Sequence, residues 1–183
     1  MKLTIISSSP RENSTSFILA NFLKQEIEEK YKEFELNFID VREWLPKMDL
    51  GQDVYSDLSK VPEKLQDLGK VMFETDVFLI VSPEYNGSYS YALKKLLDHF
   101  PKQKHKYFAI ATSSTGAMCG MRCALALQHY VIALFGTLIP QMLITPLVDK
   151  KFDKDGNLVD EAFQKSVDVY LNNIKEYTLD KKS

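Results

Sequence analysis

The sequence predicts an α/β fold in which helices cover both faces of one parallel sheet. Short apolar segments alternate with longer amphipathic segments along the chain, five of each in strict succession. Two of them, Val77–Ser82 and Tyr107–Thr112, contain continuous apolar runs, which are typical of strands buried on both faces. Because right-handed crossovers deposit the connecting helices on both faces of a parallel sheet, the alternation predicts a doubly wound, three-layer sandwich.

The first half of the chain begins with the β-rich segment Lys2–Ser7, which we expect to form the first strand. Ser14–Tyr31 places its apolar side chains at helical spacing above a polar face of Lys, Gln and Glu. Phe34–Val41 alternates polar and apolar residues, which predicts a second strand. Arg42–Lys60 contains Pro, Gly and several Asp and Ser residues and is predicted as a loop, after which Val61–Glu74 resumes helical spacing.

The second half of the chain adds three helices around the two continuous apolar strands. Ser88–Phe100 is predicted as the helix after the first of these strands, and Met118–Phe135 as a long apolar helix after the second. Leu138–Thr145 is predicted as the last strand, although Pro140 removes a backbone donor from it. Asp160–Tyr177 has the periodicity of a closing amphipathic helix.

The composition is that of a single globular domain over residues 1–183, with 45% hydrophobic and 26% charged residues. The formal net charge of −2 lacks the Lys and Arg excess that neutralises phosphates, so we expect no nucleic-acid partner. The apolar run Leu3–Ile6 is too short for a secretion signal, and Ala124–Ile139 is interrupted by polar residues and too short to span a bilayer. We therefore expect a cytoplasmic protein with no membrane partner.

Cysteine and histidine residues give no pattern of metal-binding or disulfide chemistry. Cys119 and Cys123 lie one helical turn apart, a spacing unlike a CxxC redox pair, and both are expected to be reduced core residues. A redox switch is the alternative for this pair. His99, His105 and His129 are scattered without a carboxylate at ligand spacing, so no metal site is predicted.

Five parallel strands are commonly arranged in the order 2-1-3-4-5, which places a ligand crevice at the carboxyl ends of strands one and three. Three turns of the predicted fold reach this crevice. The first turn, residues 7–16, combines hydroxyls, Arg11 and the free N–H groups of a helix start, a donor set that suits a phosphomonoester dianion. The sequence has neither GxxxxGK[ST] nor GxGxxG, so nucleoside triphosphate and pyrophosphate motifs are absent. A serine-rich helix cap with an exposed Arg is the alternative interpretation.

The second and third turns carry groups that suit a planar ligand. Residues 82–88 form a Gly-containing bend that can present backbone N–H and C=O groups to a heteroaromatic ring, with Tyr85 as a wall. Residues 113–120 contain three hydroxyls and two glycines that permit close backbone approach by a ligand. Taken alone, the first of these segments is also explained as turn punctuation and the second as a flexible helix cap.

Three motifs give the chain its resemblance to a known family: SSSPRENSTS at 7–16, SPEYNGS at 82–88 and SSTGAMCG at 113–120. From about Met1 to Tyr177 the chain resembles the flavodoxin-like NAD(P)H-dependent FMN reductases, which include quinone, azo-dye and chromate reductases. The resemblance implies a flavodoxin-like sandwich with a five-stranded parallel sheet. It implies a homo-oligomer, either dimer or tetramer, that passes hydride from NAD(P)H to bound FMN and then reduces a small-molecule electron acceptor such as a flavin, quinone or azo compound.

The resemblance also implies three groups of cofactor-binding residues. The FMN phosphate would be held by Ser9, Arg11, Ser14 and Ser16. The isoalloxazine ring would lie against Pro83, Glu84, Tyr85, Asn86 and Gly87. The pyrimidine side of the ring would be closed by Ser113, Thr115 and Gly116. No catalytic residue is assigned, because hydride transfer to FMN requires no protein acid or base. NADPH rather than NADH is the expected hydride donor.

Three positions depart from the family pattern. Ser8 stands where the family has Gly, Cys119 stands in place of another Gly, and Ser90-Tyr91 replaces Pro-Gly. Two alternative functions remain from the sequence: a flavodoxin-type electron carrier, and a flavodoxin-like domain without catalytic activity, which the Ser8 and Cys119 departures favour.

Overall fold

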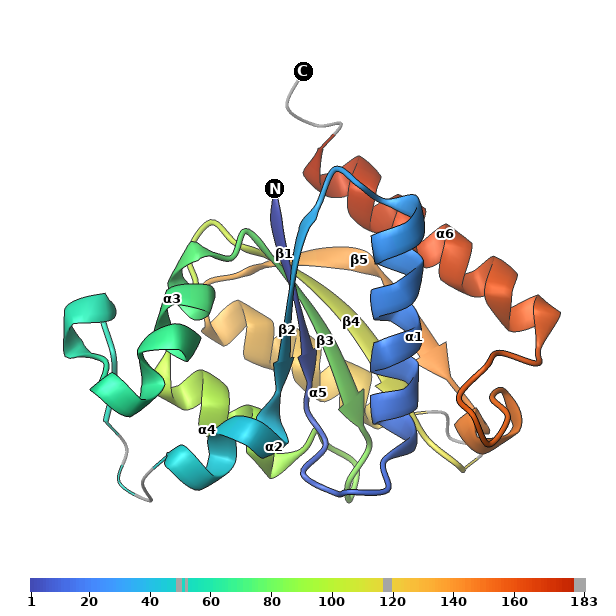
Figure 1. Ribbon diagram of the computed structural model, residues 1–183, viewed down its shortest axis with the longest axis horizontal. Helices are drawn as coiled ribbons and strands as arrows, with labels where there is room; N and C mark the ends of the chain where they lie inside the picture. The colour runs from blue at the N-terminus through green and yellow to red at the C-terminus, as the bar shows by residue number, and fades with distance from the viewer. Residues whose placement is uncertain (49–50, 52, 117–119, 180–183) are drawn as a thin grey trace.

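The computed structural model describes residues 1–48, 51, 53–116 and 120–179. One five-stranded parallel sheet runs through the centre of these residues in the order β2-β1-β3-β4-β5, which confirms the predicted topology (Figure 1). The strands are β1 Lys2–Ser7, β2 Glu35–Asp40, β3 Val77–Pro83, β4 Tyr107–Ser113 and β5 Thr137–Thr145.

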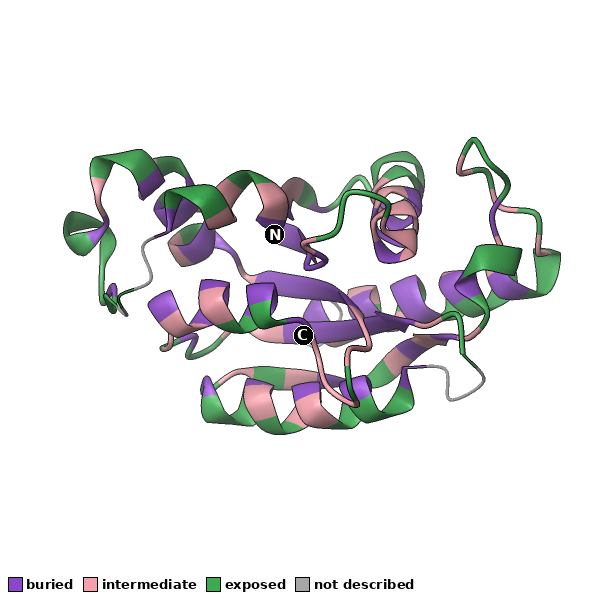
Figure 2. Ribbon diagram, turned by 90° about the horizontal axis from the view of Figure 1, so that it is seen from below, coloured by how far each residue is buried: buried purple, intermediate pink, exposed green. Residues whose placement is uncertain are grey.

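Helices cover both faces of the sheet, as the alternation of segments predicted. One face packs against α1 Thr15–Lys30 and α6 Glu161–Thr178, which share a hydrophobic core with the side chains of Leu3, Ile5 and Leu79. The opposite face packs against α3 Gln66–Glu74, α4 Tyr91–His99 and α5 Met121–Ala133. Figure 2 shows the buried strands between helices whose outer sides are exposed.

The segment predicted as a loop, Arg42–Lys60, is partly helical, so that prediction was wrong. The helix α2 spans Val41–Trp44, and 3-10 turns follow at Leu45–Lys47 and Leu58–Lys60. The carboxylate of Asp40 caps α2 by accepting the N–H of Arg42 at 3.0 Å and also pairs with the Arg42 guanidinium. This local cap stabilises a short helix that the composition of the segment hides.

Three predicted helices begin later in the structure than their hydrophobic periodicity indicated. The helix predicted from Val61 begins at Gln66, after a 3-10 turn at Glu63–Leu65 that follows Pro62. The helix predicted from Ser88 begins at Tyr91, because residues 85–88 form a tight turn. The helix predicted from Met118 begins at Met121, after Gly120 with a positive φ of 80°; Met118 and Cys119 lie outside the described residues.

Pro140 lies in β5, which occupies one edge of the sheet. The register between β4 and β5 shifts at this point: Phe108 lies opposite Leu138, whereas Ile110 lies opposite Met142. An edge strand with an irregularity is where a proline is tolerated, since its missing N–H is not needed by the ladder. The prediction of a strand at this position is therefore confirmed.

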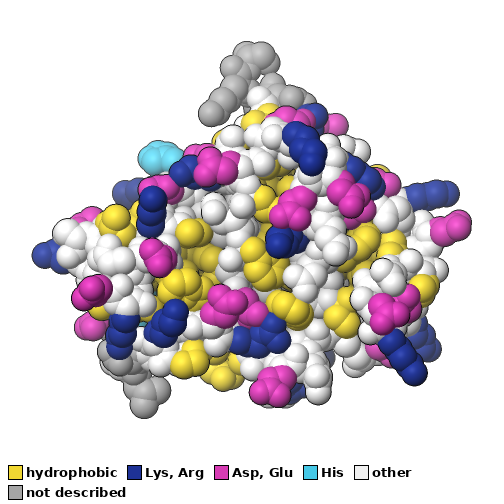
Figure 3. All heavy atoms as spheres, in the orientation of Figure 1, with side chains coloured by type: hydrophobic (Ala, Val, Ile, Leu, Met, Phe, Trp, Pro, Cys, Tyr) yellow, Lys and Arg dark blue, Asp and Glu magenta, His cyan; other side chains and the backbone are white. Residues whose placement is uncertain are grey.

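Within the described residues, no helix combines the length and the hydropathy that crossing a bilayer requires. On the face drawn in Figure 3, acidic and basic side chains are interspersed and neither sign dominates.

The carboxyl ends of β1, β3 and β4 lie along one edge of the sheet, and the loops that leave them begin at Ser8, Glu84 and Ser114. The sheet therefore brings the three predicted turns together.

Candidate active site

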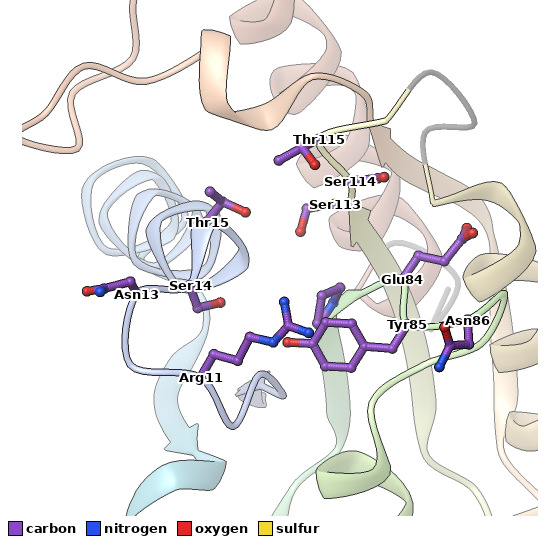
Figure 4. A pocket seen from close by; sticks show the side chains of 11 residues that line it. Arg11, Asn13, Ser14, Thr15, Glu84, Tyr85, Asn86, Ser113, Ser114 and Thr115 are labelled. Carbon is purple, nitrogen blue, oxygen red and sulfur yellow. The ribbon is translucent and has the colours of Figure 1, made fainter.

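A pocket of about 310 Å³ lies at this edge of the sheet, between the three turns (Figure 4). It is lined by Arg11, Asn13, Ser14, Thr15, Pro83, Glu84, Tyr85, Asn86, Ser113, Ser114 and Thr115. Hydroxyl groups, one guanidinium and exposed backbone groups thus surround a single cavity that draws on residues more than one hundred positions apart.

The first turn contributes the N-terminus of α1. Ser14 caps this helix, because its side chain accepts the N–H of Phe17 at 3.3 Å. The hydroxyls of Ser14 and Ser16 lie 2.8 Å apart, and Ser16 is buried. A helix N-terminus carries unpaired N–H donors and a partial positive charge, so this end of the pocket suits an anionic group.

Arg11 and Tyr85 join the first turn to the second. The guanidinium carbon of Arg11 lies 4.4 Å from the centroid of the Tyr85 ring, a cation–π contact. The Tyr85 hydroxyl lies 3.1 Å from Oγ of the buried Ser9, and the same Oγ accepts the N–H of Arg11 at 3.3 Å. Ser9 therefore holds both of its larger neighbours at the pocket.

The second turn is a two-residue hairpin with Asn86 and Gly87 at its tip. The N–H of Tyr85 donates to the carbonyl of Ser88 at 2.8 Å, and the N–H of Ser88 donates back at 3.0 Å. The φ angles of Asn86 and Gly87 are 51° and 79°. Two consecutive positive φ angles define the tight turn that an Asn-Gly pair favours, so the backbone at this wall of the pocket is held in one conformation.

The carboxylate of Glu84 is buried and paired. It accepts Nε of Arg122 at 2.9 Å and Nη2 of Arg122 at 2.7 Å. The backbone N–H of Cys123 donates to its second oxygen at 3.4 Å. Both partners belong to the first turn of α5, whose positive dipole end favours a carboxylate.

The third turn places a hydroxyl at the pocket without giving it a hydrogen bond. Oγ of Ser113 is buried and has no hydrogen-bond partner among the residues that the structure describes. Its neighbour Ser114 accepts the N–H of Gly116 at 3.0 Å and donates its own N–H to the carbonyl of Thr145. A buried hydroxyl without a partner costs free energy, so Ser113 is suited to a polar atom of a ligand.

Most of the site residues expected from the sequence line the pocket, and the others adjoin residues that line it. Ser9, Ser16 and Gly116 are hydrogen-bonded to lining residues, and Gly87 belongs to the tight turn. Three lining residues were not assigned individually from the sequence: Asn13, Thr15 and Ser114. Their position within the same two turns was the available signal.

Two departures from the family pattern contact each other. The hydroxyl of Ser90 donates to the carbonyl of Ser8 and also caps α4 by accepting the N–H of Leu93 at 3.1 Å. The hydroxyl of Ser8 donates to the carbonyl of Val81 at 3.0 Å. Both serines are fully buried, so their hydroxyls tie the first turn to β3 and α4. The third departure, Cys119, lies outside the described residues.

Neither tyrosine after the second turn lines the pocket. The ring of Tyr89 stacks on that of Tyr130 with centroids 5.0 Å apart, and Tyr91 is 65% exposed. The hydroxyl of Tyr130 donates to Asp98 at 2.7 Å, and Lys94 pairs with the same carboxylate. Of the three tyrosines considered from the sequence, only Tyr85 remains available to a ligand at this pocket.

The described residues contain no group of three His, Cys, Asp or Glu side chains that could hold a metal ion. Burial raises the pKa of the Cys123 thiol to about 12. Since the thiol stays protonated at neutral pH, it is not poised as a nucleophile. The site is thus a binding pocket built from donors and a ring, with a paired carboxylate at its side.

A comparison with family models identifies the relatives of this chain. The model described as NADPH-dependent FMN reductase matches residues 1–148. The chain belongs to this family. Membership confirms the predicted class of activity, an oxidoreductase that uses FMN and a reduced nicotinamide.

Curated relatives in this FMN reductase family match the chain over nearly its full length. An FMN-dependent NADPH-azoreductase of Staphylococcus saprophyticus is 30% identical over 178 residues, with 95% of this chain and 93% of the relative covered. The protein of the same description from Staphylococcus aureus is 26% identical, with 97% of this chain and 95% of the relative covered.

Solved structures share the fold of this FMN reductase family member. An oxidoreductase from Corynebacterium diphtheriae has a TM-score of 0.74 at 15% identity and covers 98% of this chain and 97% of its own. The flavoenzyme NAD(P)H:(acceptor) oxidoreductase FerB from Paracoccus denitrificans has a TM-score of 0.71 at 20% identity, with 97% and 99% covered. The predicted flavodoxin-like fold is thereby confirmed.

Proposed function

We propose that the pocket holds FMN and that the enzyme transfers electrons from NADPH to a flat aromatic acceptor. The observation that carries the proposal is the convergence of three features on one pocket of about 310 Å³. These are the N-terminus of α1, the tight turn at residues 85–88 and the hydroxyl of Ser113, which has no hydrogen-bond partner in the part of the chain that the structure describes. A phosphate, a planar ring and a polar ring atom are the three ligand features that this set of groups suits.

The donor set fits FMN at the phosphate end. The hydroxyls of Ser14 and Ser16, the guanidinium of Arg11 and the N–H groups of the first turn of α1 would hold the phosphate. A dianion gains from charge-assisted hydrogen bonds at such a site, because both the guanidinium and the helix dipole are positive. Ser9 supports this arrangement by accepting the N–H of Arg11.

The ring end fits a flavin as well. Pro83, Glu84, Tyr85, Asn86 and Gly87 would form one wall, and their backbone is held by the paired hydrogen bonds of the turn. Ser113, Thr115 and Gly116 would close the opposite side, and Ser113 would find there the hydrogen-bond partner that residues 1–48, 51, 53–116 and 120–179 do not supply.

FMN held by these residues would supply the hydride and electron-transfer chemistry of the reaction. The protein would bind the flavin and the substrates, orient them and exclude water from the pocket. Glu84 is neutralised by Arg122, and the Cys123 thiol stays protonated because burial raises its pKa, so neither is assigned a role as catalytic acid or base. Because one pocket serves both substrates in turn, a ping-pong cycle is expected.

The acceptor proposed first is an azo compound, with quinones and free flavins as the other members of the class. Support comes from the curated relatives, which are described as azoreductases, and from the Tyr85 ring at the pocket. An aromatic acceptor stacked on such a ring gains about 0.5–1.5 kcal/mol beyond its buried area.

The test is an anaerobic titration of the purified protein. We expect a yellow protein whose flavin absorbance bleaches on addition of NADPH and recovers on addition of an azo dye or a quinone. A yellow protein that NADPH does not bleach would favour the electron-carrier alternative. A colourless protein that does not bind added FMN would favour a domain without catalytic activity.

We also propose a cytoplasmic homo-oligomer assembled through α5. Four apolar side chains on or beside this helix are 44–66% exposed: Met121, Leu125, Ile132 and Phe135. The first three repeat at helical spacing and form one stripe, which is more apolar than the solvent face of a helix requires. A two-fold dimer that pairs this stripe with itself would cover it.

A further inference from the structure

The second turn at the pocket, residues 82–88, is the ring-side turn, since the proposed flavin ring would lie against it. Glu84 is its one carboxylate, and the Glu84 side chain is only 7% exposed. A carboxylate removed from water to this extent needs charged or hydrogen-bonding partners, because its desolvation costs several kcal/mol. Figure 4 shows the Glu84 side chain pointing away from the Tyr85 ring rather than toward it. Its partners lie on α5 instead.

Arg122 supplies the charge that Glu84 needs. Two guanidinium nitrogens, Nε at 2.9 Å and Nη2 at 2.7 Å, contact the same carboxylate oxygen, while Oε2 accepts the N–H of Cys123. The Sγ of Cys123 in turn lies 3.6 Å from the carbonyl oxygen of Pro83. The first turn of α5 thus anchors the start of the ring-side turn at three points.

The same arginine also lies beside the far end of the turn. A Cβ atom added to Gly87 would lie 3.7 Å from both Cδ and Nε of Arg122. The Arg122 side chain therefore runs along the outside of the turn from Glu84 to Gly87. The Asn-Gly pair sets the conformation of the tip itself, and the contacts of Glu84 with α5 set where the turn lies at the pocket.

Arg122 itself is not part of the core. Its side chain is 58% exposed, and it does not line the pocket. Substitution of Arg122 leaves the Glu84 carboxylate without its charged partner, so urea unfolding of each variant accompanies the binding measurement. A variant that stays folded under the assay conditions and still loses flavin affinity loses it through the turn.

We propose that Arg122 is a positioning residue: it holds Glu84 and thereby fixes the backbone of residues 84–87 at the ring end of the flavin pocket. The inference rests on the proposed function, since it assumes that the ring lies at this turn. It differs from the role of Arg11, which would act on the phosphate.

The experiment compares the affinities of FMN and riboflavin by fluorescence titration of the apoprotein. Arg122→Ala is expected to weaken both flavins by the same factor, about tenfold, because both carry the ring and the loss of a charged hydrogen bond is of this order. Arg122→Lys should restore little, since an ammonium cannot reproduce the two-nitrogen contact. Lys94→Ala, which breaks an exposed ion pair on α4, is the matched control and should leave both affinities unchanged.

Three other outcomes would overturn the inference. A loss confined to FMN would place Arg122 at the phosphate. Unchanged flavin affinity with a raised KM for NADPH but not NADH would assign Arg122 to the 2′-phosphate of the donor. Unchanged flavin affinity and unchanged donor kinetics would leave it without a role at the site. Failure of the wild-type protein to bind either flavin would instead reject the proposed function, which keeps the two failures distinct.

Discussion

The guanidinium of Arg11 stacks on the ring of Tyr85, 4.4 Å from its centroid, and so links the first turn at the pocket to the second. Seventy-four residues separate the two side chains in sequence. Ser9 completes the link through its hydrogen bonds to both residues. Substitution of either side chain is therefore expected to change ligand binding at both ends of the pocket, but to different extents.

Arg11→Ala should weaken FMN by about 1.5–3 kcal/mol, the range for hydrogen bonds to charged groups. Riboflavin lacks the phosphate and should lose less than about 1 kcal/mol, the value of an exposed cation–π contact. Fluorescence titration of the apoprotein with both flavins measures the difference. Equal losses for FMN and riboflavin would remove Arg11 from the phosphate site.

Tyr85→Ala should reduce the preference for aromatic acceptors, because it removes the ring that lines the pocket. The expected effect on kcat/KM for an azo dye corresponds to about 0.5–1.5 kcal/mol. Tyr91→Ala is the matched control, since the Tyr91 ring is 65% exposed and lies outside the pocket. Steady-state rates with an azo dye, a quinone and free FMN measure both variants. A larger change in acceptor selectivity for Tyr91→Ala would reverse the assignment.

Ser90→Ala should destabilise the fold by about 1–3 kcal/mol. The substitution removes the cap of α4, worth about 1 kcal/mol, and leaves the carbonyl of Ser8 without its buried donor. Urea unfolding measures the change. Ser166→Ala, on α6, removes an exposed hydroxyl and should change the free energy of unfolding by less than about 0.5 kcal/mol. Equal effects of the two substitutions would show that the Ser90 contacts contribute nothing.

Cys123 is expected to make folding stability fall at alkaline pH. Burial raises its pKa from 9.0 to about 12, so the folded protein keeps a proton that the unfolded chain releases above pH 9. The stabilising contribution is complete below pH 9 and is lost as the pH rises toward 12. Between pH 7.5 and pH 10 the loss is about 1.4 kcal/mol.

The measurement is urea unfolding of the wild type and of Cys123→Ala at pH 7.5 and pH 10. Other titrating groups affect both proteins alike, so the difference in their free energies of unfolding isolates the thiol. The stability advantage of the wild type should shrink by the amount given above. A difference that stays constant between the two pH values would contradict the prediction.

Leu125→Asp should convert the proposed oligomer into monomers, because a charge in a buried apolar interface has no partner there. Light scattering at micromolar concentration measures the molar mass. Val169→Asp, an exposed apolar position on α6, is the control and should leave the mass unchanged. A wild-type protein that is already monomeric at this concentration would reject the assembly.

The architecture could be predicted because it depends on local patterns. Continuous apolar runs such as Val77–Ser82 specify strands with both faces buried, because leaving either face uncovered would expose apolar side chains to water. Once five such strands alternate with helices, few topologies remain, and the carboxyl ends of β1 and β3 define the crevice. The three ligand-facing turns were identifiable for this reason.

The positions at which helices begin, and the helical content of residues 42–60, were harder to predict from the sequence. Asp40 caps α2 and Ser90 caps α4, and each cap depends on a backbone geometry that hydrophobic periodicity does not contain. Ser90 is also held by the carbonyl of Ser8, a partner 82 residues away. Sequence patterns report the intrinsic preference of each segment for helix or strand, and they do not identify hydrogen-bond partners that are distant in the chain.

By itself the sequence determined the parallel sheet, its order and the identity of the three turns, because burial of apolar strands and turn chemistry are properties of neighbouring residues. Only the tertiary structure decided that Arg122 pairs with Glu84, that Tyr89 stacks on Tyr130, and that the hydroxyl of Ser113 has no partner among the described residues. These outcomes depend on distances between residues far apart in the chain. Such distances are set by the packing of helices on the sheet, which places each charged or hydroxyl group beside a partner or leaves it to a ligand.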